Sequence, residues 1–155
     1  MDEFRTVGNR DMSDLVEKND DPAILVSGAL TSMHLMAAAD RYLSEEEVSL
    51  IADLLYKVTG VEVGPDEIIA SSREIDEKST GGSIFWQSAF EPYRNLSLSS
   101  RGIILKSAMM VALSDGEFHD EEKRTLGDLA GWLGLTPDEY VSVLEQVRDE
   151  TPGDA

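Results

Sequence analysis

The sequence contains no cysteine, and its charged residues are strongly biased toward one sign. Without cysteine the chain can form no disulfide, no thiolate metal site and no cysteine nucleophile. Its 31 acidic residues outnumber its 13 basic ones, which gives a formal net charge of −18. Binding to nucleic acid or to anionic lipid depends on Lys and Arg that neutralise phosphate, so both are disfavoured as direct partners. Cations and basic protein surfaces are the partners that this charge attracts.

Long apolar runs and targeting signals are also missing. The longest mostly apolar stretch, residues 23–39, contains several polar side chains and falls short of the ~20 apolar residues that span a bilayer. The first residues, MDEFRTVGNRDM, lack the basic region and the apolar region of a secretory signal. We therefore expect a soluble, cytoplasmic protein with no direct membrane insertion. Its 155 residues suffice for one domain with a sizeable core.

Signatures of catalysis and of nucleotide binding are absent as well. STGGS, residues 79–83, is neither a P-loop nor a dinucleotide-binding fingerprint, and no G-x-S-x-G motif occurs. The two histidines, His34 and His119, show no zinc-hydrolase pattern. We expect His34 to be a partly buried core residue whose hydrogen bonds are satisfied. An enzyme that uses an Asp/Glu pair as acid and base has no substrate-pocket signature here, so we expect no enzymatic activity.

Helix start and stop signals are what the sequence has in abundance. Ser44 and Glu47 form a capping box, and Asp21 precedes a proline at a helix start. Gly60 and Gly134 follow the last apolar turn of two amphipathic segments, where glycine commonly ends a helix. No segment alternates with a period of two. We predict an all-α fold, a compact bundle of about seven helices that begin near residues 21, 44, 65, 84, 99, 120 and 137.

The chain contains an internal repeat with an offset of 75 residues. Residues 30–58 and 105–133 are identical at eight of 29 positions, where ordinary composition would give about two. Each copy consists of an apolar helix, an acidic turn, a capped amphipathic helix and a helix started by proline. Neither copy can bury its apolar stripe alone, so we predict that they pack face to face about a pseudo-twofold axis. The identical residues of the first copy are Leu30, Ser32, Ala37, Asp40, Glu46, Glu47, Asp53 and Leu54.

These patterns predict one domain between two polar ends. Residues 1–20 are acidic with little periodicity and predict a mobile arm, and the single helical domain covers residues 21–150. Repeat one covers about 21–78, a flexible joint 79–83, and repeat two about 84–150. Pro92 should interrupt the helix that follows the joint. The aromatic side chains of this segment should fill the space between the repeats; they are Phe85, Trp86, Phe90 and Tyr93.

The stretch SDGEFHDEE, residues 114–122, brings five carboxylates, one imidazole and one glycine together. In a structural interpretation, the glycine ends one helix and His119 or Asp120 caps the next. The positive end of that helix's dipole then stabilises the last two glutamates. In a functional interpretation, the oxygens bind a hard divalent cation, which takes about six to eight such ligands. The spacing is not that of an EF-hand. A similar turn, ADRYLSEEE, occupies residues 39–47.

Face-to-face repeats would bring the two acidic turns together in one pocket of carboxylates. A cation would relieve their mutual repulsion, whereas an empty pocket would raise a carboxylate pKa. A histidine beside carboxylates could also ligate Zn²⁺ or another transition metal, although an exposed histidine at a turn is usually only solvated. The candidate metal ligands are Asp40, Glu47, Asp115, Glu117 and Glu122, with His119 and Asp120 as additional candidates.

VALSDGEFHDEEKRTLGDLAGWLGLTPDEY, residues 111–140, resembles the signature of the bacterial TerB-like tellurite-resistance family. Members carry an apolar helix ending in A-x-A-D-G-E, a turn with a capping Ser, then E-E and an amphipathic helix closing in L-G-(I/L)-(S/T). AAADRYLSEEEVSLIADLLYKVTG, residues 37–60, resembles the same unit. Arg41, Tyr42 and His119 depart from the usual Gly, Glu and Ser or Thr, and a weakened first half-site would follow.

The resemblance implies an all-helical protein of two pseudo-symmetric halves, with a divalent-metal site at the acidic turns. It also implies a role in resistance to tellurite and related stress, without catalysis. The cation would be Ca²⁺, Mg²⁺, Mn²⁺ or Zn²⁺, and we expect a protein partner that could itself be membrane-associated. The alternative is a protein-interaction module whose acidic face binds a basic partner without any metal.

Overall fold

The computed structural model describes residues 21–37, 44–78, 83–115 and 118–149. These residues form seven α-helices and two short 3-10 helices, with no strand among them, which confirms the predicted all-α fold. The elements are α2 (Pro22–Ala37), α3 (Glu45–Thr59), α4 (Pro65–Lys78), α5 (Ser83–Phe90), η3 (Glu91–Asn95), α6 (Leu98–Ala112), η4 (Leu113–Asp115), α7 (Asp120–Trp132) and α8 (Pro137–Asp149).

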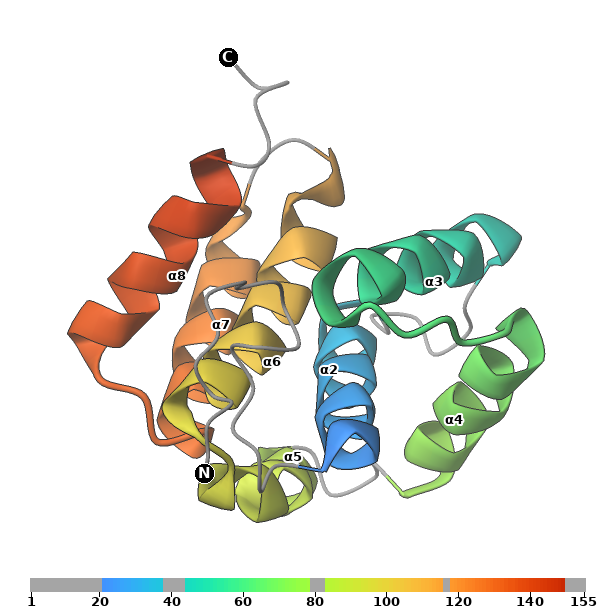
Figure 1. The fold of residues 1–155 in the computed structure, drawn as a ribbon, viewed down its shortest axis with the longest axis horizontal. Coiled ribbons are helices and arrows are strands. Elements are labelled where there is room, and N and C mark those ends of the chain that lie inside the picture. The colour runs from blue at the N-terminus through green and yellow to red at the C-terminus, as the bar shows by residue number, and fades with distance from the viewer. Residues whose placement is uncertain (1–20, 38–43, 79–82, 116–117, 150–155) are drawn as a thin grey trace, which may run out of the picture.

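Helices α2 and α6 lie side by side at the centre of the molecule (Figure 1). Helices α7 and α8 cover the α6 side, α3 packs across both α2 and α6, and α4 lies beyond α3 on the α2 side. The short helix α5 closes one end of the bundle, near the start of α2. The predicted arm, residues 1–20, lies outside the described residues, and so does the joint apart from Ser83.

Small residues allow α2 and α6 to approach closely. A Cβ atom on Gly28 would lie 2.6 Å from Cδ1 of Ile104 and 3.1 Å from Cδ1 of Tyr93, so only glycine leaves room here. The buried hydroxyl of Ser32 lies 2.8 Å from the carbonyl oxygen of Ala29 and 2.9 Å from that of Ile104. The hydroxyl shares its single proton between one carbonyl acceptor in each helix, so a polar contact joins the two helices at the centre of the core.

The apolar core lies on both sides of this helix pair. One cluster packs α6 against η3, α7 and α8, and a second packs α2 against α3 and α4. Helices α2 and α6 carry four methionines, of which three are buried and the fourth, Met36, is half-buried. Methionine suits such positions because its flexible side chain fills irregular gaps. The three buried methionines are Met33, Met109 and Met110.

The aromatic residues after the joint connect the two halves, as predicted. Phe90 is completely buried, and its ring stacks on that of Trp132 in α7, with the ring centres 6.2 Å apart. Tyr93 lies beside Phe90, and its hydroxyl oxygen is 2.9 Å from Oγ of Ser27 in α2. The prediction for Pro92 is also confirmed, because α5 ends at Phe90 and a 3-10 turn follows.

The predicted helix caps are present. The backbone N–H of Ser44 donates to Oε1 of Glu47 (2.8 Å), and the N–H of Glu47 donates to Oγ of Ser44 (3.1 Å). Thr136, which directly precedes α8, is bonded in the same reciprocal way to Glu139. Gly60 and Gly134 follow α3 and α7 with positive φ angles of 77° and 75°. Local sequence signals therefore set the ends of these helices.

The order of the helices repeats along the chain, but their packing does not. α2, α3 and α4 correspond in sequence to α6, α7 and α8. In the second half α8 packs along α6, whereas α4 packs mainly on α3 and only lightly on α2. The repeat of elements is thus observed, and the pseudo-twofold axis stays a prediction.

The close approach of α2 and α6 can be tested at Gly28. The variant Gly28→Ala should lower the free energy of unfolding by about 1–2 kcal/mol, because the new methyl group overlaps Cδ1 of Ile104. Ile104→Val removes that atom, so the double variant should be more stable than the sum of the two single losses predicts. Urea denaturation measures the free energy of unfolding of the two single variants and the double variant.

Gly127→Ala in α7 is the control for this experiment. A Cβ atom there would meet nothing within 4 Å, so the variant should gain about 0.5–1 kcal/mol from helix propensity. Strictly additive losses in the Gly28 and Ile104 variants would contradict the overlap.

Candidate functional site

The two acidic turns lead into helices with carboxylates in their first turns. α3 begins with three glutamates, and α7 begins with one aspartate and two glutamates. Negative charge at this end of a helix is stabilised by the helix dipole, by about 0.3–1 kcal/mol for each exposed group. The structural interpretation of these residues is therefore supported in both halves. The residues are Glu45, Glu46, Glu47, Asp120, Glu121 and Glu122.

Glu47 and Glu122 occupy equivalent positions and make equivalent bonds. Oε1 of Glu47 accepts the backbone N–H of Ser44 at 2.8 Å, and Oε1 of Glu122 accepts the backbone N–H of His119 at 2.8 Å. His119 is the N-cap residue of α7, and it is one of the two residues predicted for this position. Each of these bonds uses one oxygen, and an ionised carboxylate can accept from or coordinate further partners. The oxygen chemistry of both residues thus fits a hard cation.

Other predicted ligands lie largely outside what the structure describes. Asp40 and Glu117 are outside the described residues, and of Asp115 only the backbone, at the end of η4, is described. Asp120 is exposed at the first position of α7. Within the described part of the chain, no group of three or more His, Asp or Glu side chains could hold a metal ion. The shared cation site, which also needs Asp40 and Glu117, therefore stays a prediction.

His34 differs from its prediction in two respects. It is 1% exposed rather than partly buried, and neither ring nitrogen has a hydrogen-bond partner among the described residues. Burial lowers the pKa of its imidazole from 6.5 to about 4, because the charged form would lose its hydration. The repeat could have indicated this environment, because the equivalent residue 75 positions later is Met109, which is also fully buried.

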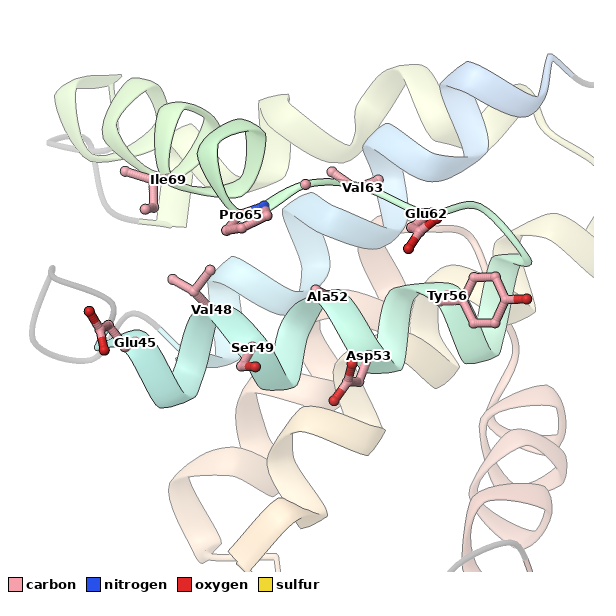
Figure 2. A pocket seen from close by; sticks show the side chains of 11 residues that line it. Glu45, Val48, Ser49, Ala52, Asp53, Tyr56, Glu62, Val63, Pro65 and Ile69 are labelled. Atoms are coloured by element: carbon pink, nitrogen blue, oxygen red, sulfur yellow. The ribbon is translucent and has the colours of Figure 1, made fainter.

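A groove between α3 and the segment that leads into α4 was not predicted (Figure 2). Its volume is about 1170 Å³. One wall is a stripe along α3, and the other consists of residues 62–65 together with Ile69 of α4. Tyr56 could have indicated the groove from the sequence, because this aromatic residue lies outside the apolar stripe that faces the core; in the structure it is exposed. The α3 wall consists of Glu45, Val48, Ser49, Ala52, Asp53 and Tyr56.

The fold and the two turns define a class: an all-helical protein in which an apolar helix, an acidic turn and a capped helix occur twice. The family model of the tellurite resistance protein TerB matches residues 27–145, more than half of the 155-residue chain. The chain belongs to the TerB family, as its sequence predicted. No curated protein and no solved structure shows significant similarity to it. No helix in the described ranges combines the length and the apolar character needed to cross a membrane.

The unpartnered His34 should make stability depend on pH. Between pH 6.5 and about 4 the unfolded chain binds a proton at this residue that the folded chain does not bind. The free energy of unfolding of the wild type should therefore fall relative to His34→Leu as the pH decreases through this range. The relative loss should reach about 3 kcal/mol near pH 4, from the size of the pKa shift.

Urea denaturation of both proteins at several pH values measures this difference, in which the contributions of the carboxylates cancel. Met109→Leu, at the equivalent core position of the second half, should show no such change with pH. A constant difference between the wild type and His34→Leu would show that the folded protein protonates His34 as readily as the unfolded chain does.

Proposed function

We propose that this TerB-family protein binds a divalent cation at its paired acidic turns and acts without catalysis in resistance to tellurite or a related stress. One observation carries the proposal: Glu47 and Glu122 hold the same position and the same bond in the two copies of the acidic turn. The family supports the resistance role. The proposed ligands are Asp40, Glu47, Asp115, Glu117 and Glu122, with Asp120 and His119 adjacent to them.

The composition of this ligand set favours a hard cation. Its carboxylate oxygens suit Ca²⁺, Mg²⁺ or Mn²⁺, and participation of His119 would extend the choice to Zn²⁺. Positive charge is also favoured by the protein as a whole, whose net charge is −18. We place this activity in the cytoplasm, where the protein would act with a partner protein that could be bound to the membrane.

Isothermal titration calorimetry tests the cation site. At least one of Ca²⁺, Mg²⁺, Mn²⁺ and Zn²⁺ should give saturable heat with the full chain at up to millimolar concentration. Asp40→Asn combined with Asp115→Asn should weaken that binding at least about tenfold, because two ligand charges are lost. These substitutions leave the capping glutamates in place.

The matched control is Asp53→Asn combined with Asp128→Asn, which changes the net charge equally on the bodies of α3 and α7. It should leave the affinity within about twofold of the wild type. The absence of heat with all four ions, or equal losses in the two double variants, would contradict the metal site.

A second candidate function is protein interaction, in which the acidic face binds a basic partner without a metal. The observation that favours it is that Glu47 and Glu122 each already have a structural bond, so neither requires a cation to explain its presence. The first turns of α3 and α7 leave most of their carboxylates exposed, where a basic surface can reach them.

Binding of fluorescent polylysine distinguishes this function from the metal site. The affinity should fall steeply between 50 and 300 mM salt, since the screening length of exposed charges falls from about 14 Å to about 6 Å over this range. It should be unchanged by EDTA. Loss of binding on chelation would instead assign the acidic face to the cation.

A further inference from the structure

The groove along α3 lies at the edge of the core of the first half, on a face of the helix that is only partly covered. Its residues recur at spacings of three and four, so they form one continuous stripe. The core of the first half is formed mainly by a neighbouring stripe of α3; Val48 belongs to both faces, and Ala52 lines the groove while it packs against the core. Helix α3 therefore has two functional faces, one toward α2 and α6 and one that lines the groove.

The floor of the groove is apolar and its rim is acidic. Val48 is buried, while Ala52, Val63 and Ile69 are half-buried, so apolar surface remains open to a ligand. Tyr56, with 58% of its surface exposed, stands at the far end of α3 (Figure 2). The carboxylates that line the groove are Glu45 at one end, and Asp53 and Glu62 toward the other.

The second half of the protein does not repeat this surface. The stripe of α7 that corresponds to the groove face carries basic residues and glycines in place of the apolar side chains and the tyrosine. All of them are exposed, and the following helix, α8, packs along α6 instead of leaving a gap beside α7. The groove is therefore a specific feature of the first half. The corresponding α7 residues are Lys123, Arg124, Gly127, Asp128 and Gly131.

We propose that this groove binds a cationic amphipathic helix of a partner protein. Apolar side chains on one face of that helix, at spacings of three and four residues, would cover the floor formed by Ala52, Val63 and Ile69. Lys or Arg residues flanking them would meet Glu45 at one end and Asp53 at the other, which lie about 12 Å apart along α3. The proposal rests on the interaction function given above and assigns it a place and a partner of defined shape.

Charge excludes the nearest alternative ligands. A second copy of this chain would bring a further net charge of −18 toward an acidic rim. Residues 1–20 contain six acidic and three basic residues, so their charge is also unfavourable beside an acidic rim. Opposite charge across an interface selects the partner and speeds its association. A heterologous basic segment is the ligand that fits.

A labelled model peptide of about four helical turns, with Leu at helical spacing and Lys elsewhere, tests the proposal by fluorescence anisotropy and amide NMR. We expect saturable binding, with shifts concentrated in residues 45–56 and 62–69. Asp53→Lys should weaken binding at least about tenfold. Asp128→Lys, which makes the same charge change at the equivalent position of α7, should weaken it less than about twofold.

A second peptide with the same composition, in which Leu and Lys alternate, separates shape from charge. It should bind at least about fivefold more weakly, because it has no apolar helix face. Equal losses in the two lysine variants would overturn the groove as the site, while the acidic-face function would still stand. Failure of the helical peptide to bind would also overturn it. Groove shifts that depend on protein concentration alone would assign the groove to a second copy, and shifts on removal of residues 1–20 would assign it to the arm.

Discussion

The contact between α2 and α6 is the constraint on which the rest of the structure depends. Gly28 allows Ile104 to enter the surface of α2, and Ser32 shares its proton between the two helices. Both apolar clusters are built outward from this pair, one toward α7 and α8 and the other toward α3 and α4. A side chain at Gly28 would force Ile104 and Tyr93 to shift, so this position affects how closely the two halves of the protein join.

In the proposed function, the same residues of the acidic turns have a structural and a chemical role. Glu47 and Glu122 each complete a helix start through one oxygen, and the bond also fixes the direction of the carboxylate. Ligands that are oriented before a cation arrives lose less conformational freedom when it binds. The helix cap and the proposed metal site are therefore compatible, because the capping bond orients the carboxylate that would bind the cation.

Features that depend on local chemistry could be predicted from the sequence, whereas those that depend on packing could not. The capping box at Ser44, the glycine stops and the break at Pro92 each involve residues a few positions apart, and all were correct. The environment of His34 was wrong because a single polar residue on an apolar helix does not reveal which side faces the core. The groove was missed because it depends on where α4 lies, and the repeat had suggested that α4 would lie as α8 does. The acidic turns were found from residue types, but their separation is set by the fold.

The light attachment of α4 has a consequence for how the protein responds to a ligand. Among its described side chains, Ile68 is the buried apolar residue, whereas α8 buries both Val143 and Val147. Because α4 packs mainly on α3 rather than on the central helices, a shift of α4 leaves the contact between α2 and α6 intact. The wall opposite α3 is thus adjustable.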